Sequence, residues 1–425
     1  MKKPKKNYWE ERSRMSNIPK LRFPEFSGEW EEKNFYEVFD ILQNNTFSRD
    51  QLNNENGIVR NIHYGDVLIK YGDYIDCQKE KLPFINLENN LSKYEDTSYV
   101  KNGDIIIADT AEDYTAGKVT EICNVKDYKI LSGLHTFLCR TKFEFASKFL
   151  GYKLNSSSYH NQIAPLVAGT KVYSINRKAI GETTITYPSK AEQQKIADFL
   201  ANVDSIITAE TKILNTLQKK KKALMQKLFS RQLRFKSDDG KDFPAWEEKK
   251  LGDVCETYSG GTPKSGTAEY YGGEIPFIRS GEISSNKTEL FLTEKGMENS
   301  SAKMVSKGDI LYALYGANSG LCSISKIDGA INQAILCIKT NENKRFLCNY
   351  LQYQREYFYS TYLQGGQGNL SGKLVESFII PLPCIAEQQK IADCLSSLDS
   401  LIQTQQKVVT TWQQRKKALL QQMFI

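Results

Sequence analysis

Polar, glycine-rich segments contain the residue types that could bind a polyanion. They lie at residues 71–74, 109–118 and 169–174 in the first half of the chain, and at 259–264, 315–320 and 365–371 in the second half. Glycine lets backbone N–H groups approach a phosphate closely, while Asn, Gln, Arg and Lys present hydrogen-bond donors to the edges of bases. The set favours nucleic-acid binding, although for any single residue an ordinary surface turn is the favoured interpretation.

Cationic side chains near these segments are candidates for contacting a phosphate backbone. They are Arg60, Lys70, Arg177, Lys264 and Arg279. The first-half segments add hydroxyl, aromatic and amino groups, those of Tyr71, Tyr74, Thr110, Lys118, Lys171 and Tyr173. Together with Arg60, Lys70 and Arg177, these residues are our predicted DNA contacts in the first half of the chain.

Motifs for catalysis or metal binding are missing from the sequence. No Pro-Pro pair is present, so the N/D-P-P-Y/F loop of an amino-methyltransferase is excluded. Gly261 and Gly266 have the glycine spacing of a phosphate-binding loop, but Thr267 follows where that loop requires lysine. The triplets Glu31–Lys33 and Glu247–Lys249 fit the Glu-x-Lys of a nuclease, a pattern common in charged chains. We predict no catalytic residue and no metal ligand.

Composition indicates a globular protein with a mildly basic balance. The 425 residues carry a formal net charge of +7, and no stretch approaches the roughly 18 apolar residues of a membrane span. The 9 cysteines are scattered without a C-x-x-C pair, which favours reduced thiols and a cytoplasmic location. Lysine runs occur near the N-terminus and at residues 219–222; each is also compatible with a solvated face or a disordered tail.

A duplicated stretch organises the rest of the chain. Residues 191–229 return without a gap as residues 386–424, with about half of the positions identical, and both copies begin AEQQKIAD. Apolar residues alternate in steps of four and three, which predicts a helix with one seam that faces a partner helix. The seam residues are Ile196, Leu200, Val203, Ile207, Leu214, Leu217 and Leu224 in the first copy, and Ile391, Leu395, Leu398, Ile402, Val409, Trp412 and Leu419 in the second.

Both seams become polar at matching places, Glu210 with Gln405 and Lys221 with Lys416. Polar seam positions often fix the register of paired helices. Two independent amphipathic helices, each lying on its own domain, are the alternative. Either way, 39 residues form a rod of roughly 58 Å.

The segments before each helix form the remainder of the repeat. Each has a lead-in containing Trp-Glu-Glu-Lys, followed by a β-rich domain at about 40–185 or 255–380. Turns feed predicted strands at 105–108 and 310–313, and we expect a third such strand at 65–69. Short helices are predicted at 145–152 and 345–353. The matched domains differ in their glycine-rich segments, as expected for two heads that bind different ligands.

These phrases resemble the specificity subunit of Type I restriction–modification enzymes, HsdS. The resemblance extends from about residue 19 to the end, through LRFPEFSGEWEE, SGGTPKSG, GGEIPFIRSGEIS, KGDILYALYGANSG, GGQGNLSG and both AEQQKIAD copies. It implies an α+β fold with two target recognition domains, each followed by a long helix. The helices are expected to pair as an antiparallel coiled coil with pseudo-two-fold symmetry. The implied segments are 1–20 (flexible basic arm), 21–190 and 233–385 (recognition domains), and 191–232 and 386–425 (spacer helices).

The resemblance also implies what the chain binds. Each domain reads one half of an asymmetric, two-part sequence in double-stranded DNA, and the helices dock two methyltransferase subunits. Restriction subunits complete the complex, and S-adenosylmethionine, ATP and Mg²⁺ are bound by partner subunits. By the resemblance of the loop motifs, the residues expected to contact DNA in the second half of the chain are Gly261, Thr262, Lys264, Arg279, Ser280, Asn318, Ser319, Asn332, Gln333, Gln367 and Asn369.

Two alternatives from other functional classes stay open on the sequence alone. One is a self-contained DNA nuclease or methyltransferase, which would act on DNA without partners. The other is a coiled-coil assembly scaffold whose domains bind protein. DNA binding through several phosphates weakens steeply with salt, so salt dependence separates the scaffold from a DNA-binding protein.

Overall fold

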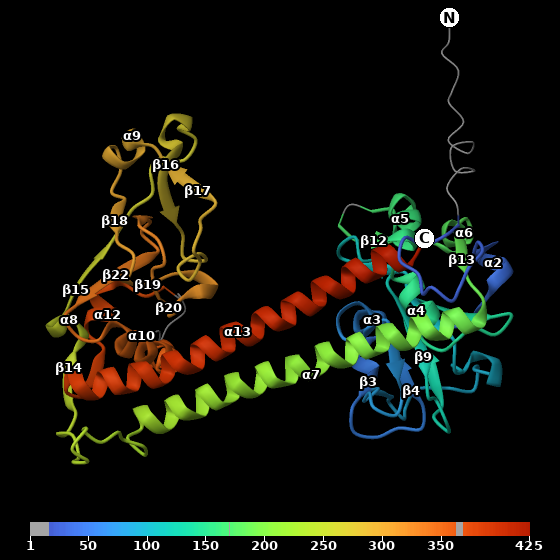
Figure 1. Ribbon diagram of the computed structural model, residues 1–425, viewed down its shortest axis with the longest axis horizontal. Helices are drawn as coiled ribbons and strands as arrows, with labels where there is room; N and C mark the ends of the chain where they lie inside the picture. The colour runs from blue at the N-terminus through green and yellow to red at the C-terminus, as the bar shows by residue number, and fades with distance from the viewer. Residues whose placement is uncertain (1–16, 170, 363–368) are drawn as a thin grey trace, which may run out of the picture. The chain divides into compact units, whose positions relative to one another are not determined.

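The computed structural model describes residues 17–169, 171–362 and 369–425 (Figure 1). Close packing divides the chain into two compact units. One contains the residues up to Glu210 together with Val408–Ile425, and the other is Thr211–Lys407. Each unit therefore combines one β-rich domain with parts of both long helices. The domain boundaries given above stay a prediction.

The first unit is built on a five-stranded sheet of order β2-β11-β7-β9-β5 and a four-stranded sheet of order β10-β4-β6-β3. The smaller pairs are β1 with β13 and β12 with β8. The strands are β1 (Glu31–Asn34), β2 (Phe39–Leu42), β3 (Leu52–Asn53), β4 (Arg60–Ile62), β5 (Tyr74–Asp76), β6 (Phe84–Ile85), β7 (Ile105–Ala108), β8 (Thr110–Ala111), β9 (Val119–Cys123), β10 (Ile130–Ser132), β11 (Thr136–Thr141), β12 (Tyr173–Ser174) and β13 (Thr184–Tyr187). The α-helices are α2 (Phe35–Val38), α3 (Tyr64–Ile69), α4 (Phe149–Leu154), α5 (Ser157–Ile163), α6 (Arg177–Gly181) and α7 (Lys190–Phe229), with 3-10 turns η1 (Arg49–Gln51), η2 (Asp96–Ser98) and η3 (Ala164–Leu166).

The second unit has two four-stranded sheets, of order β15-β22-β19-β20 and β17-β16-β21-β18, and the pair β14 with β23. The strands are β14 (Glu247–Lys250), β15 (Cys255–Ser259), β16 (Tyr271–Ile278), β17 (Leu290–Leu292), β18 (Lys303–Val305), β19 (Ile310–Ala313), β20 (Cys322–Ile324), β21 (Gly329–Ile331), β22 (Ile335–Thr340) and β23 (Ile379–Leu382). The helices are α8 (Leu251–Val254), α9 (Glu294–Glu298), α10 (Lys344–Tyr353), α11 (Arg355–Tyr362), α12 (Gly372–Glu376) and α13 (Ile385–Met423), with turns η4 (Ala268–Tyr270) and η5 (Gly316–Asn318).

Matching strand registers show that the two domains share one scaffold. Strand β7 lies between β9 and β11, as β19 lies between β20 and β22. The Glu-x-Lys triplets fall on the lead-in strands β1 and β14, which pair antiparallel with β13 and β23 directly before the long helices. The triplets are therefore explained by the scaffold, and the predicted mixed α/β architecture is confirmed.

The predicted strand at residues 65–69 is wrong, because this segment forms the helix α3. His63 caps the helix, with its Nδ1 accepting from Gly65 N at 3.2 Å. Asp66 lies in the first turn, where a carboxylate favours a helix N-terminus. The apolar run Val67–Ile69 is typical of a strand, but the cap that His63 provides favours a helix.

The two long helices pair through their predicted seams. All the seam residues named above are buried or half-buried, from Leu200 at 0% exposure to the half-buried Trp412. In the first unit Lys416 Nζ binds Asp204 at 2.6 Å, and in the second Lys221 Nζ binds Asp399 at 2.6 Å. The contact residue on α7 moves forward by 17 positions, from 204 to 221, while its partner on α13 moves back by 17 positions, from 416 to 399. The two helices therefore run antiparallel. Over the described residues, neither these nor any other helix is long and apolar enough to cross a membrane.

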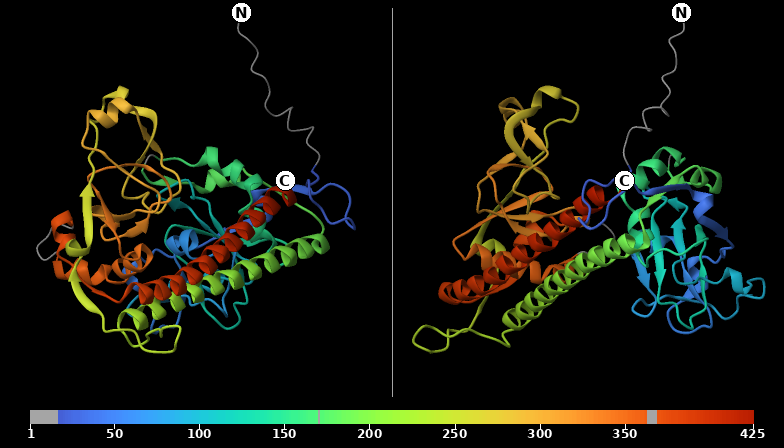
Figure 2. Two further views of the ribbon diagram at one scale, coloured as in Figure 1. Left: turned by 60° about the vertical axis from the view of Figure 1, so that its left-hand side comes forward. Right: turned by 45° about the vertical axis from the view of Figure 1, so that its right-hand side comes forward.

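The core of the first unit contains the C-terminal end of α13. Met423 and Phe424 are 2% and 3% exposed and belong to the same cluster as residues of the first domain. The Phe424 ring lies 6.2 Å from that of Trp30 and 5.8 Å from that of Phe149. Both views in Figure 2 show the red end of α13 against this domain.

The second unit repeats this arrangement with the end of α7. Phe229 is 5% exposed, and its ring lies 5.7 Å from that of Phe346, which in turn contacts Trp246 at 5.9 Å. Each domain is therefore completed by the helix that follows the other domain, which explains why the AEQQKIAD stretches end in similar apolar residues.

The Glu of each AEQQKIAD motif is a buried anchor for the lead-in. Glu192 is 1% exposed and accepts two hydrogen bonds from Arg22, both at 2.7 Å. Glu387 is fully buried and accepts from Arg234 at 3.0 and 2.7 Å. Bidentate guanidinium–carboxylate pairs satisfy buried charge with a fixed geometry. The motif thus holds each domain to the start of its helix.

Candidate nucleic-acid interface

The described parts of the glycine-rich segments of the second domain meet at one end of its sheets. Strands β16 and β21 run parallel with Ile278 opposite Ile331, so the residues that follow them leave the sheet side by side. Leu314 N donates to Ala334 O at 2.8 Å, and Leu370 N donates to Leu314 O at 2.9 Å. We call residues 260–264, 279–282, 314–320, 332–334 and 369–371 the second loop cluster.

Arg279 is fixed at this cluster by two carboxylates. Its Nε and Nη2 contact Glu282 at 3.2 and 3.0 Å, and Nη2 reaches Glu289 at 2.5 Å. Desolvation raises the pKa of Glu282, but hydrogen bonds from Arg279, Glu289 N and Thr288 outweigh it and lower the pKa to about 2. The guanidinium side chain remains 40% exposed, so it is oriented yet accessible.

Most of the other predicted residues of the second domain reach this cluster. Thr262 Oγ1 donates to Gln333 Oε1 at 2.6 Å and so joins the first loop to the loop after β21. Side chains that are exposed or half-exposed belong to Thr262, Lys264, Ser280, Asn318, Asn332, Gln333 and Asn369. Gln367 lies outside the described residues.

Two predicted contacts of the second domain shape the loops instead of presenting a side chain. Ser319 is 1% exposed, and its hydroxyl donates to Leu314 O at 3.0 Å. A Cβ atom at Gly261 would lie 1.9 Å from Ser301 Oγ, so only glycine fits there. The structure thus gives both residues a packing role.

The first domain gathers equivalent loops at the equivalent end. Strands β4 and β10 are parallel with Ile62 opposite Ser132, as β16 and β21 are in the second domain. Ile175 N donates to Asp109 O at 2.9 Å, the counterpart of the Leu370–Leu314 bond. Residues 43–45, 63–66, 109–116, 133–135 and 171–176 form the first loop cluster.

Aromatic and imidazole side chains that we did not predict dominate the first loop cluster. The Tyr64 ring lies 4.6 Å from that of His63 and 5.4 Å from that of His135. His135 Nδ1 is 3.3 Å from Asp109 Oδ1. The available signal was the similarity of residues 62–65 (IHYG) to 278–281 (IRSG), which places His63 and Tyr64 where Arg279 and Ser280 stand.

Arg49 was also missed, because its partner is distant in the sequence. Its Nη1 and Nη2 contact Asp66 at 2.8 and 3.0 Å, and Nη2 lies 3.4 Å from His63 Nδ1. Burial lowers the pKa of His63, and the neighbouring Arg49 cation lowers it further. Asp66 therefore orients an arginine at the same scaffold position at which Glu282 orients Arg279.

Four of the predicted first-domain residues lie in or beside this cluster. Thr110 Oγ1 donates to Asp109 at 2.7 Å, and the Tyr173 ring lies 4.5 Å from that of Tyr114, with the two rings tilted by 40°. Lys171 lies two residues before β12 and Arg177 three residues after it, and both side chains are exposed. These four residues stay candidates for DNA contact.

The remaining predicted first-domain residues are engaged elsewhere. Tyr71 is 3% exposed, and Lys118 Nζ donates to the carbonyls of Leu68 and Tyr71 at 2.8 and 3.0 Å. Desolvation lowers the pKa of Lys118. Lys70 Nζ donates to Lys81 O at 2.9 Å. Lys118 and Tyr71 thus support the turn between α3 and β5.

Tyr74 and Arg60 are also placed away from the loops. The Tyr74 ring packs 6.1 Å from that of Tyr152, within the core that contacts the long helices. The Arg60 guanidinium lies between Phe84 and Tyr128, 5.0 and 4.0 Å from their ring centres. Arg60 begins β4, whereas the loop cluster follows the end of that strand.

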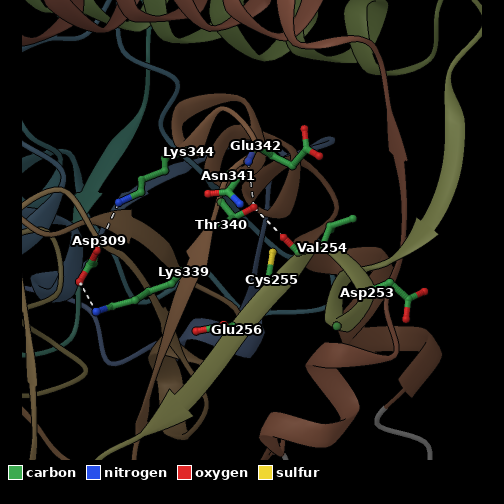
Figure 3. A pocket seen from close by; sticks show the side chains of 11 residues that line it. Asp253, Val254, Cys255, Glu256, Asp309, Lys339, Thr340, Asn341, Glu342 and Lys344 are labelled. Atoms are coloured by element: carbon green, nitrogen blue, oxygen red, sulfur yellow. Dashed lines mark hydrogen bonds and ion pairs between the residues drawn. The ribbon is translucent and has the colours of Figure 1, made fainter.

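A polar cavity of about 660 Å³ lies at the opposite end of the second domain (Figure 3). Figure 3 shows Asp309 between Lys339 and Lys344, with Nζ–carboxylate distances of 3.9 and 3.2 Å. Asp309 precedes β19, whereas Leu314 of the loop cluster follows it. The cavity is therefore separate from the candidate interface, and its lysines are partly neutralised. Across the described ranges, no group of His, Cys, Asp and Glu is arranged to hold a metal ion.

Comparison with known proteins explains the repeated architecture. The model of the Type I restriction modification DNA specificity domain family matches residues 27–219 and again 245–411. The chain belongs to this family. The putative Type I restriction enzyme MjaX specificity subunit of Methanocaldococcus jannaschii is 26% identical over 422 residues, 95% of each chain. The MjaVIII specificity subunit of the same organism is 24% identical, over 83% of this chain and 90% of that one.

A solved structure shares the fold of this family member. It is the crystal structure of a Type I restriction–modification S subunit from M. genitalium, with a TM-score of 0.56 and 18% identity. The match covers 96% of this chain and 99% of that chain. The specificity chain is thus a non-catalytic, DNA-recognition component with two recognition domains, which excludes the self-contained nuclease or methyltransferase.

Proposed function

We propose that the chain reads a two-part, asymmetric sequence in double-stranded DNA, one half with each loop cluster. The observation that carries the proposal is that equivalent scaffold positions hold different side chains. His63 and Tyr64 stand in the first cluster where Arg279 and Ser280 stand in the second. Base edges are distinguished by their pattern of donors, acceptors and methyl groups, so different side chains select different bases.

The paired helices set the distance between the half-sites in this proposal. Helix α7 has 40 residues and α13 has 39, so each is about 60 Å long. That length exceeds one turn of B-DNA, about 34–36 Å. The two Lys–Asp pairs support a fixed register, because a slip along the seam would break both.

Partner subunits supply the chemistry of the complex. Two methyltransferase subunits dock on the helices, and restriction subunits with translocase activity join them. The methyltransferase subunits bind S-adenosylmethionine, and the restriction subunits use ATP and Mg²⁺. This chain then contributes base recognition and subunit placement alone.

Changing the length of a helix tests the spacer. Four residues inserted into α7 of the assembled complex are expected to alter the number of base pairs between the half-sites, while the bases of each half-site stay the same. Sequencing the methylated sites of cells that carry the variant measures both properties. Altered half-site bases with an unchanged interval would contradict the proposal.

Salt dependence separates DNA recognition from protein scaffolding. Binding of the complex to a duplex with the methylated sequence is expected to weaken steeply as salt rises, since each phosphate contact contributes a slope of about −0.9 in log affinity against log salt. A duplex with shuffled half-sites is the control. Equal affinity for the two duplexes would reject sequence recognition.

A further inference from the structure

The two domains differ at one edge of the shared sheet. In the first domain β9 is covered by β5, which runs parallel to it with Ile75 opposite Ile122. Glu121 N donates to Asp73 O at 3.0 Å, just before β5. In the second domain the equivalent strand is β20, because Ile324 pairs with Ile310 as Glu121 pairs with Ile105. Within the described ranges β20 ends its sheet, and no strand covers it.

Strand alternation turns the backbone of Ile324 toward this open edge. Ser325 N donates to Asp309 O at 2.8 Å, so Ser325 faces the neighbouring strand β19. In an antiparallel pair, adjacent residues alternate between facing the partner strand and facing away from it. The N–H and C=O of Ile324 therefore point outward, as those of Glu121 do toward Asp73 in the first domain.

The helix lysines differ in the same way. Lys416 Nζ contacts Asp204 and also Asp73, both at 2.6 Å. Its counterpart Lys221 contacts Asp399 at 2.6 Å, and in the described part of the chain no second carboxylate lies within ion-pair distance. The second carboxylate of the first unit thus comes from the residue that leads into the covering strand.

A cavity of about 520 Å³ lies where the second domain lacks this strand. Its lining includes Lys221, Lys326 and Arg345, but a single carboxylate, that of Asp399. The Asp399 side chain is 50% exposed, against 24% for Asp204 in the filled counterpart. The lining of the cavity is cationic and offers hydrogen-bonding groups, and these properties suit an acidic peptide.

We propose that β20 accepts an extended, acidic segment of a partner protein as an added parallel strand. Its backbone pairs with Ile324, and an Asp or Glu side chain binds Lys221 as Asp73 binds Lys416. Strand addition of this kind gains affinity from backbone hydrogen bonds and specificity from side-chain pockets. The exposed strand edge favours a peptide over the phosphates of DNA, which carry no donors to pair with a strand.

One residue modulates how closely the segment approaches. At Gly151 of the first domain, a Cβ atom would lie 2.0 Å from Asp73 O. Ala146 N donates to Gln193 and Asn343 N donates to the matching Gln388, so positions 146 and 343 correspond. Gly151 and Cys348 each lie five residues further along, so Cys348 is the equivalent position in the second domain. Cys348 lines the cavity, so Cys348→Gly is expected to tighten binding.

The test uses a peptide of residues 71–78 of this chain, with Cys77→Ser, added to the full chain. Hydrogen exchange is expected to slow at Ile324 and Lys326, and Asp73→Asn in the peptide is expected to weaken binding at least tenfold. In the full chain, Lys221→Gln should give the same loss. Ile324→Pro removes the outward N–H and should abolish protection. Lys241→Gln, outside the cavity, is the charge-matched control and should change nothing.

Three outcomes would overturn the proposal. They are protection confined to other segments, equal binding of the Asp73→Asn peptide, and displacement of the peptide by a non-specific duplex, which would assign the cavity to DNA phosphates. Thermal unfolding identifies variants that fail to fold. If Lys221→Gln or Ile324→Pro is among them, peptide binding to Cys348→Gly tests the proposal, because this variant should bind the peptide more tightly. Duplex binding by Cys348→Gly should equal that of the unmodified chain, so a failure of DNA recognition stays distinguishable from a failure of this site.

Discussion

At the scale of single residues, carboxylates orient the cations of both loop clusters. Glu282 receives hydrogen bonds from Arg279, Thr288 and the backbone, and Asp66 holds Arg49 through both nitrogens of its fork. The arginines come from different points of the chain, yet the carboxylates occupy the same scaffold position. An oriented arginine loses less conformational entropy when it contacts a base.

We expect Glu282→Gln to destabilise the second unit by about 1–3 kcal/mol at pH 7, because a charged acceptor of several hydrogen bonds is lost. The folded pKa of Glu282, about 2, lies below its ordinary value of 4.5. Its contribution is thus complete above pH 4.5 and is lost as pH falls toward 2. Urea unfolding at several pH values measures this. Glu289→Gln, at an 80% exposed carboxylate, is the control and should cost less than about 1 kcal/mol. A pH-independent difference between pH 7 and 3 would contradict the assignment.

Residues that depend on local pattern could be predicted from the sequence, and residues that depend on distant partners could not. The seam leucines follow from spacing, and the strands Ile105–Ala108 and Ile310–Ala313 follow from the turns before them. Arg49 acquires its role only because the fold brings it to Asp66, 17 positions away (66 − 49). Tyr74 looked like a surface residue, but β5 carries it into the core beside the long helices.

At the scale of elements, the helix pair contains two ionic contacts whose carboxylates differ in exposure. Lys416 is 19% exposed between Asp73 and Asp204, which are 13% and 24% exposed. Desolvation lowers the pKa of Lys416, but the two carboxylates outweigh it and raise the pKa. The protonated lysine therefore links α13 to both α7 and the first domain.

Lys416→Met is expected to destabilise the first unit by about 3–5 kcal/mol, since two partly buried carboxylates would then face each other. The matched variant Lys221→Met leaves only the half-exposed Asp399, which water can solvate, and should cost about 1 kcal/mol or less. Urea unfolding followed by hydrogen exchange in each unit compares them. Equal losses would show that Asp73 adds nothing to the contact.

The seam itself is tested by charge. Leu214 is 6% exposed and Leu217 is half-buried, so changing both to Asp places unpaired charge in an apolar contact. We expect the complex with partner subunits to be lost in size-exclusion chromatography. Asn215→Asp adds a charge at an exposed neighbouring position and should leave the complex intact. A complex that survives the double change would argue against the seam.

At the scale of the whole molecule, the two recognition domains share a common scaffold. The lead-in strands, the buried Glu–Arg pairs and the helix registers are the same in both halves, whereas the loop clusters differ. Function is therefore expected to follow the loops, and assembly is expected to follow the helices.

Replacing residues 40–185 with the corresponding domain of a relative is expected to change the bases of one half-site only. The other half-site and the interval between them should persist, because the second domain and both helices are untouched. Sequencing of methylated sites in cells that carry the hybrid measures all three. A hybrid that altered both half-sites would mean that the domains do not read independently.

The burial of Met423 and Phe424 in the first domain has a consequence for biosynthesis. The ribosome completes β13 at Tyr187 and reaches Met423 only 236 residues later (423 − 187). At about 5–20 residues per second, that delay is roughly 10 to 50 s. The nascent first domain spends this time with an unfinished apolar surface, a natural substrate for chaperones, and a prematurely terminated chain would never acquire a finished first domain.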